Sequence, residues 1–271
     1  MSELAETELV AGFPTHVLRA GAGQRRALFI HCSLAHSGAW LGVMSALLDK
    51  LSMTAFDRPG HGRSGPWLGG DAAALHAKTT EIAGSLIQKR ADVIGHSWGA
   101  TVALRLAMEW PEHVRSVVLI EPVLYALIKD QPGYAMVRGL NERLADLVAR
   151  GERMEAARLF HEVTNAGQPF DALSPDRQAR LAAQIDIVPM ESPANTVDAG
   201  GVFTRERLAK IKQPVLLLES AHPPQGLRDV HEVICAAIPQ AQRVVIAGAG
   251  HMAPVTHPEN VAGEIAAFLK L

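Results

Sequence analysis

Short apolar segments alternate with longer amphipathic ones along most of the chain, a pattern typical of a mostly parallel sheet covered by helices. Residues 117–120 read Val-Val-Leu-Ile without alternation, as expected of a strand buried on both faces. The predicted strands are 15–19, 27–31, 52–56, 91–94, 116–120, 215–219 and 243–247, with an edge strand near 8–12. The predicted helices of this part are 40–50, 72–89, 98–108, 226–237 and 258–271.

The alternation stops after Pro122 and resumes near Lys210. This interval favours four successive helices, 133–150, 152–165, 175–185 and 205–211. The chain therefore divides into a first core part, a helical insertion and a second core part, at 1–121, 122–210 and 211–271. We predict an α/β fold with an eight-stranded, mostly parallel sheet, helices on both faces and an inserted helical lid. Segments 166–169 and 198–201 could serve as hinges, although a fixed helical subdomain fits the pattern equally well.

The segment Gly95-His96-Ser97-Trp98-Gly99 carries the most specific chemical information. It follows a short apolar strand and precedes a predicted helix, which is the setting of a tight turn that exposes a serine hydroxyl. Side chains at the two glycine positions would collide with the neighbouring strand and helix. Ser97 is therefore a candidate nucleophile, and the backbone N–H of Trp98 is a candidate donor to an anionic oxygen.

A serine hydroxyl needs a neighbouring base to become nucleophilic. His251 lies in a glycine-containing loop directly after the last predicted strand. The carboxyl ends of parallel strands share one edge of the sheet, where ligands bind in open α/β sheets. We therefore expect His251 to reach Ser97 and to act as its base.

Composition narrows the possible partners. The chain has 271 residues, with 26 Lys and Arg against 28 Asp and Glu, and its basic residues are scattered. We expect neither a nucleic-acid nor a membrane partner, but a small-molecule substrate. The acidic N-terminus lacks the apolar region of a signal peptide, no apolar run is long enough to cross a bilayer, and we expect a cytoplasmic protein. Cys32 and Cys235 form no metal-type pair, the histidines lack metal-site spacing, and we expect no metal and no cofactor.

Taken together, the motifs resemble those of the α/β-hydrolases. The serine turn is joined by three further matching segments, Phe29-Ile30-His31-Cys32-Ser33, Asp57-Arg58-Pro59-Gly60-His61-Gly62-Arg63-Ser64 and Gly250-His251-Met252 with Thr256-His257-Pro258-Glu259. The matching segments cover the core on both sides of the insertion, about two-thirds of the chain. The resemblance implies that Ser97 is the nucleophile and His251 the base, and that the Trp98 and Ser33 N–H groups form an oxyanion hole. Cys32 stands where the family usually has glycine, and we interpret it as a small buried residue rather than a nucleophile.

The third catalytic residue departs from the usual pattern. In the family the acid usually follows the strand that here spans 214–218, but Pro223 occupies the expected position. Some relatives carry the acid after the preceding strand, where this chain has Glu121. A carboxylate there would need a partner, because an unpaired buried charge is costly. We favour Glu121 and keep Glu219 as the alternative.

These expectations favour a serine hydrolase that cleaves a small to medium, hydrophobic carboxylic ester or a related acyl compound. Carbon–carbon bond hydrolysis, acyl transfer and cofactor-free peroxidase chemistry share such a core and stay open, as does a non-catalytic ligand-binding protein. The oligomeric state is not predicted. The residues expected to line the substrate pocket between core and lid are Trp40, Leu124, Tyr125, Met136, Met190 and Phe203.

Overall fold

The computed structural model of the chain describes residues 6–164 and 168–271. The first part of the predicted hinge at 166–169 and the last residue of the predicted helix 152–165 lie outside the described residues. Among the described residues, no helix is both long and apolar enough to cross a bilayer.

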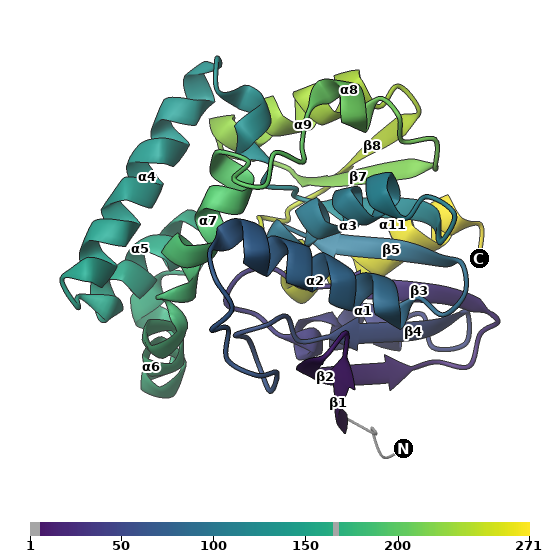
Figure 1. Ribbon diagram of the computed structural model, residues 1–271, viewed down its shortest axis with the longest axis horizontal. Helices are drawn as coiled ribbons and strands as arrows, with labels where there is room; N and C mark the ends of the chain where they lie inside the picture. The colour runs from purple at the N-terminus through teal and green to yellow at the C-terminus, as the bar shows by residue number, and fades with distance from the viewer. Residues whose placement is uncertain (1–5, 165–167) are drawn as a thin grey trace.

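One sheet runs through the molecule, with strand order β1-β2-β4-β3-β5-β6-β7-β8. β1 and β2 pair antiparallel, as do β2 and β4, and all other neighbouring strands are parallel. Figure 1 shows the order from the purple β1 to the yellow-green β8. The eight-stranded, mostly parallel sheet predicted from the sequence is therefore confirmed. The strands are β1 Glu6–Val10, β2 Phe13–Ala20, β3 Arg25–Ile30, β4 Leu51–Phe56, β5 Ala91–His96, β6 Val114–Ile120, β7 Val215–Ser220 and β8 Ala241–Ile246.

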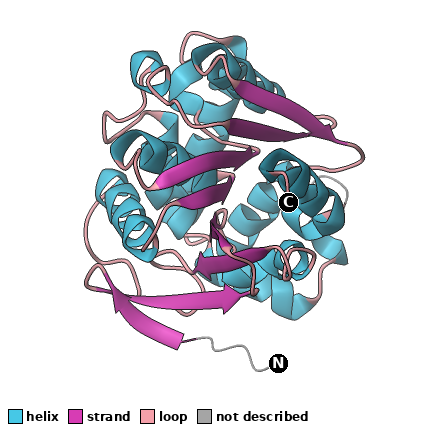
Figure 2. Ribbon diagram, turned by 90° about the vertical axis from the view of Figure 1, so that its right-hand side faces the viewer, coloured by secondary structure: helices cyan, strands magenta, loops and turns pink. Residues whose placement is uncertain are grey.

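Helices cover both faces of this sheet (Figure 2). Alternate residues of β6 enter two separate hydrophobic clusters: Val117 and Leu119 pack in the cluster of α2, α3 and α9, and Val118 and Ile120 in that of α1 and α11. This double burial explains why β6 is apolar at successive positions. The covering helices are α1 Leu41–Ser45, α2 Ala72–Leu86, α3 Trp98–Glu109, α8 Arg205–Leu208, α9 Gln225–Ala237, α10 Ala253–Thr256 and α11 Pro258–Leu269.

A group of helices lies between β6 and β7 in the sequence and to one side of the sheet in space (Figure 1). They share a small hydrophobic cluster of their own, which includes Leu144, Ala156, Ala182 and Val188. Their role as a lid stays a prediction. Their bounds are α4 Pro132–Ala149, α5 Arg153–Thr164, α6 Pro175–Gln184 and α7 Ile187–Thr196.

Helix α7 was not predicted from the sequence. It contains Pro193 in its interior, where proline removes a backbone hydrogen bond and usually ends a helix, whereas Pro189 lies in the first turn, where no such bond is lost. Tertiary packing compensates, because α7 packs against α2 and α4 and buries Val188, Glu191 and Asn195. The expected helices 40–50 and 205–211 are also shorter than predicted, at Leu41–Ser45 and Arg205–Leu208.

Asp92 lies near the start of β5 and binds side chains of the two strands that flank it, β3 and β6. Its fully buried carboxylate accepts hydrogen bonds from Arg25 Nε at 2.7 Å, Arg115 Nη1 at 3.1 Å and Ser116 Oγ at 2.7 Å. Breaking a buried ion pair by removing one partner is far more costly than breaking an exposed one.

We therefore predict that Asp92→Ala lowers the free energy of unfolding by about 3 kcal/mol. The exposed Arg138–Glu142 pair of α4, with Nε and Oε1 3.4 Å apart, provides the control. Glu142→Ala should cost no more than about 0.5 kcal/mol. Urea denaturation of the three proteins measures both values, and equal losses in the two variants would contradict the role assigned to Asp92.

Candidate active site

Ser97 occupies a strained turn between β5 and α3. Its backbone angles are φ 55° and ψ −119°, a conformation that a non-glycine residue holds only when its surroundings enforce it. A Cβ on Gly95 would lie 2.4 Å from the carbonyl oxygen of Gly99, and one on Gly99 would lie 2.3 Å from that of Ile30. Both flanking glycines are thus required sterically, as predicted from the sequence.

His251 approaches Ser97 from the loop between β8 and α10. Its Nε2 lies 2.9 Å from Ser97 Oγ. His96, directly before the serine, holds this loop, because its Nε2–H donates to the backbone oxygen of His251 at 2.8 Å. Both Ser97 and His251 are largely buried, at 6% and 9% exposure, but both line a cavity.

Glu121 lies on the other side of the imidazole. It directly follows β6, has a positive φ of 50° and is fully buried. Oε2 lies 3.3 Å from His251 Nδ1, and Oε1 accepts the Ser220 N–H at 2.6 Å. Burial raises the pKa of Glu121, but the contact with His251, the nearby His231 and the Ser220 N–H outweigh it and lower the pKa to about 2. The carboxylate is therefore ionised at neutral pH.

The contact between Glu121 and His251 also determines which imidazole nitrogen carries the proton. An ionised carboxylate can only accept a hydrogen bond, so Nδ1 of the imidazole carries the proton that faces Glu121. Nε2 is then free to accept the proton of Ser97 Oγ. The three side chains have the geometry that nucleophilic acyl transfer requires.

The structure places Glu219, the alternative acid, in a different cluster. Its Oε2 lies 2.9 Å from His231 Nδ1 and 2.8 Å from Arg243 Nη2. Burial raises the pKa of Glu219, but its bonds to His231 and Arg243 lower it overall. Of the two candidate acids, the structure brings Glu121 to the imidazole.

Ser33 and Trp98, the two expected oxyanion-hole residues, line the cavity beside Ser97. Gly99 allows the start of α3 to lie against the end of β3, two residues before Cys32, which brings these segments together. Cys32 is 3% exposed, and burial raises the pKa of its thiol to about 12. A protonated buried thiol is a poor nucleophile, in agreement with a packing role.

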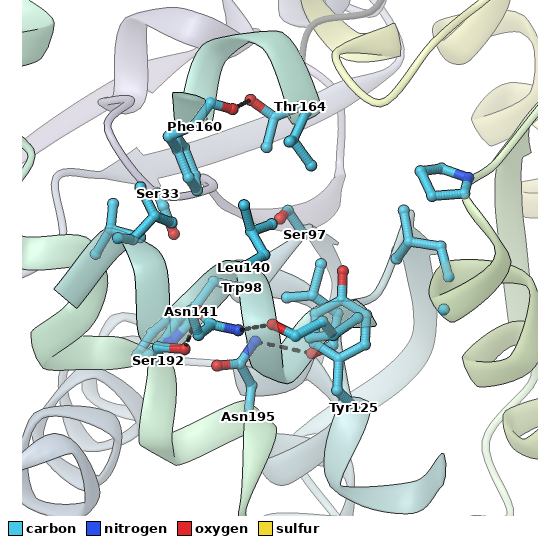
Figure 3. A pocket seen from close by; sticks show the side chains of 18 of the residues that line it. Ser33, Ser97, Trp98, Tyr125, Leu140, Asn141, Phe160, Thr164, Ser192 and Asn195 are labelled. Atoms are coloured by element: carbon cyan, nitrogen blue, oxygen red, sulfur yellow. Dashed lines mark hydrogen bonds between the residues drawn. The ribbon is translucent and has the colours of Figure 1, made fainter. Parts of the chain in front are cut away.

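The larger of the two cavities that reach Ser97, called the main cavity here, has a volume of about 220 Å³ and lies between Ser97, His251 and the inserted helices. Figure 3 shows Leu140 and Phe160 near Ser97, with Asn141, Ser192 and Asn195 gathered on one side. Ser192 Oγ donates to Asn141 Oδ1 at 2.6 Å. Apolar side chains provide most of the remaining wall, among them Val123, Val137, Leu144, Val163, Val188 and Leu227.

A smaller cavity of about 100 Å³ meets the main one at Ser97 and His251. Phe160 and Thr164 of α5 line both cavities. Cys32, Leu34, Arg177 and Met252 are among the residues that line the smaller cavity and not the main one. The site thus offers two adjoining spaces of unequal size that share Ser97 and His251.

Of the six predicted pocket residues, only Tyr125 and Met136 line the main cavity. Trp40 packs against Phe29 and His96, with ring centroids 5.2 and 6.4 Å away, and Phe203 packs against His76 at 5.5 Å. Leu124 is fully buried in the core, and Met190 packs against two hydrophobic clusters. The expectation that these four face the main cavity was therefore wrong, because apolar character alone does not separate core from pocket.

Neither the polar wall of the cavity, formed by Asn141 of α4 with Ser192 and Asn195 of α7, nor the buried Glu191 of α7 was predicted from the sequence. Pro193 argues against the helix that carries three of these residues, and a polar residue such as Asn141 within a predicted helix gives no local sign that it faces a cavity. Among the described residues, no group of three or more histidine, cysteine, aspartate or glutamate side chains is placed to hold a metal ion.

Known proteins share this architecture. In Cupriavidus necator, the dihydrolipoyllysine-residue acetyltransferase component of the acetoin cleaving system is 36% identical over 121 residues, which are 42% of this chain. The match spans 31% of that relative, or about a third of its length. The pimeloyl-[acyl-carrier protein] methyl ester esterase of Nitrosomonas europaea is 27% identical over 259 residues, which cover 90% of this chain and 95% of the relative.

Among solved structures, a 2-hydroxy-6-oxo-6-phenylhexa-2,4-dienoate hydrolase from Rhodococcus sp. strain RHA1 shares the fold with a TM-score of 0.76 and 20% identity, and 98% of each chain is covered. A carboxylesterase from Bacillus subtilis gives a TM-score of 0.74 and 22% identity, covering 98% of this chain and 90% of that one. A family model described as the alpha/beta hydrolase fold matches residues 28–258. The chain therefore belongs to the α/β-hydrolase family.

Proposed function

We propose that this α/β-hydrolase is a serine esterase that cleaves a carboxylic ester with a hydrophobic acyl group. The observation that carries the proposal is the 2.9 Å contact between Ser97 Oγ and His251 Nε2 on a strained, sterically enforced turn. The pimeloyl-[acyl-carrier protein] methyl ester esterase of N. europaea, similar over 90% of this chain, supports ester hydrolysis.

In the first step Ser97 Oγ attacks the ester carbonyl carbon while His251 Nε2 takes the hydroxyl proton. Glu121 stabilises the imidazolium that forms and keeps the ring in the productive tautomer. The backbone N–H groups of Trp98 and Ser33 donate to the oxyanion of the tetrahedral intermediate. When the intermediate collapses, the alcohol leaves with the proton from His251 and the acyl group stays on Ser97.

Deacylation repeats these steps with water. His251 takes a proton from the water molecule as its oxygen attacks the acyl carbon. The second tetrahedral intermediate uses the same oxyanion donors, and its collapse returns the proton to Ser97 and releases the carboxylic acid. Each half-reaction leaves His251 neutral, and Glu121 stays ionised throughout.

The two cavities suggest how the substrate is divided. The main cavity, with its largely apolar wall, suits the acyl chain. The smaller cavity is lined by Met252, which directly follows His251, and so suits the alcohol that receives the proton of His251. We therefore propose a substrate with a medium-length apolar acyl group and a small alcohol.

Ser97→Ala is predicted to abolish covalent labelling by a fluorophosphonate probe and to lower turnover of p-nitrophenyl butyrate by roughly 10⁶-fold. Cys32→Ala should still be labelled, because the buried thiol is protonated and is not the nucleophile. Gel fluorescence and p-nitrophenol release report the two effects. Labelling of Ser97→Ala would refute the assignment, and a labelled chain that hydrolyses no ester would redirect the search to the other reactions of this catalytic core.

Glu121→Gln should lower kcat by on the order of 10⁴-fold while the protein stays folded, because the amide no longer selects the productive imidazole tautomer. Glu219→Gln is the matched control, since it removes the same charge from a buried carboxylate that contacts His231 instead. It should retain nearly full kcat. The opposite ranking would move the acid to Glu219, and full activity in the double variant would indicate a Ser-His dyad.

Leu140→Trp fills the main cavity near Ser97 and should shift the acyl preference toward shorter chains. We expect the ratio of kcat/KM for p-nitrophenyl octanoate to that for the butyrate to fall at least about 10-fold, as occupying part of an apolar pocket typically does. Arg143→Trp adds the same ring at an exposed position of α4 and should leave the ratio unchanged. An unchanged ratio in Leu140→Trp would show that the acyl chain binds elsewhere.

A further inference from the structure

Glu191 of α7 contacts both residues proposed to form the oxyanion hole. The hydroxyl of Ser33 donates a hydrogen bond to Glu191 Oε1. The indole Nε1–H of Trp98 points to the backbone oxygen of Glu191 at 3.4 Å. Glu191 is only 1% exposed, and the Ser33 hydroxyl that it binds is partly buried at the wall of the main cavity.

Arg58 balances the charge of Glu191. Its Nη1 lies 2.9 Å from Glu191 Oε2, and neither side chain is exposed by more than 1%. The guanidinium carbon lies 4.1 Å from the centroid of the Trp98 ring, an arrangement that favours a cation over the aromatic face. Glu191 and Arg58 therefore form a buried pair in direct contact with both oxyanion-hole residues.

The same arginine also supports the loop that carries Ser33. The backbone N–H of Arg58 donates to His31 Nε2 at 2.9 Å, and His31 Nδ1–H donates to the carbonyl oxygen of Cys32 at 2.7 Å. His31 must be neutral for this pattern, and burial together with the charge of Arg58 lowers its pKa well below 6.5. Cys32 is therefore held on one side by His31, which binds the Arg58 backbone, and is followed on the other by Ser33, which binds Glu191.

The loop needs such support because it is strained. Leu34, directly after Ser33, has a φ of 55°, which a non-glycine residue adopts at a cost. Strained backbone persists only where surrounding contacts hold it. The hydrogen bond between Ser33 and Glu191 lies next to this residue, so it restrains the peptide whose N–H is to meet the oxyanion.

We propose that Glu191 is a positioning residue, which holds the Ser33 and Trp98 peptides in the geometry that binds the oxyanion. Because Glu191 lies on α7, catalysis then depends on the position of this helix. This inference rests on the proposed ester hydrolysis through Ser97. Glu191 acts through the two donors and not by reacting with the substrate. Its effect therefore falls on the transition state, because the donors bind the charge that develops there.

Ser33→Ala tests this role most cleanly. It keeps the backbone N–H of residue 33 and the Arg58–Glu191 pair, and removes only the hydroxyl that binds Glu191. Loss of a whole oxyanion donor costs about 10² to 10³ in kcat, so a displaced donor should cost about 10- to 100-fold. KM for p-nitrophenyl butyrate should change by less than about twofold, because ground-state binding is kept.

A transition-state analogue separates positioning from general loosening of the fold. Butylboronic acid forms a tetrahedral adduct with a catalytic serine and places an oxygen in the oxyanion hole. Its inhibition constant should rise in Ser33→Ala by the same factor by which kcat falls. Ser33→Thr keeps the hydroxyl and should restore most of the wild-type kcat and most of the inhibitor affinity. Thr196→Val is the matched control: it removes a hydroxyl from α7 whose one hydrogen bond within the described part of the chain goes to the backbone oxygen of Ser192, and it should leave kcat and inhibitor affinity unchanged.

Glu191→Gln completes a double-mutant cycle with Ser33→Ala. If Glu191 acts through Ser33, adding Ser33→Ala to the Glu191→Gln variant should lower kcat by less than about twofold. If Glu191→Gln does not fold because Arg58 is left unpaired, the kcat and the inhibition constant of Ser33→Ala still test the role of Glu191. Wild-type kcat and boronate affinity in Ser33→Ala would overturn the proposal, whereas a wild-type protein without esterase activity or probe labelling would overturn the proposed function instead.

Discussion

The burial of one negative charge constrains the whole catalytic centre. Glu121 is ionised and has no solvent exposure, and a buried charge is tolerated only where partners replace the lost hydration. Ser220 supplies an N–H from the neighbouring strand, and His251 supplies the facing imidazole. The same contacts that stabilise the carboxylate orient the histidine toward Ser97, so structural stability and the proposed catalysis depend on the same atoms.

Parallel strands make this arrangement possible. β5, β6 and β8 end at one edge of the sheet, and Ser97, Glu121 and His251 each follow one of these strands by a few residues at most. Positive φ angles at Ser97 and Glu121 turn the chain sharply at two of the strand ends. The helices between β6 and β7 enclose the cavity above this edge and contribute Glu191, which links them to the loop of Ser33.

Features with a local or periodic cause could be predicted from the sequence. The unbroken apolar run of β6 reflects burial on both faces, and the glycines around Ser97 reflect contacts within a single turn. Features decided by tertiary packing could not. Pro193 argues locally against α7, yet the helix forms because its buried face packs against α2 and α4. Trp40 and Phe203 are as apolar as the true pocket residues, and only the packing of the helices shows that they face the core.

We propose that Ser97, activated by His251 and Glu121, carries the acyl group during turnover. To test this, the wild-type protein is mixed with excess p-nitrophenyl butyrate, quenched with acid at times before and during steady-state p-nitrophenol release, and its peptides are mapped by mass spectrometry. We predict a butyryl group on the peptide that contains Ser97, formed before steady-state p-nitrophenol release is established. Turnover with no acylated peptide at any time, or with the acyl group on Cys32, would contradict it.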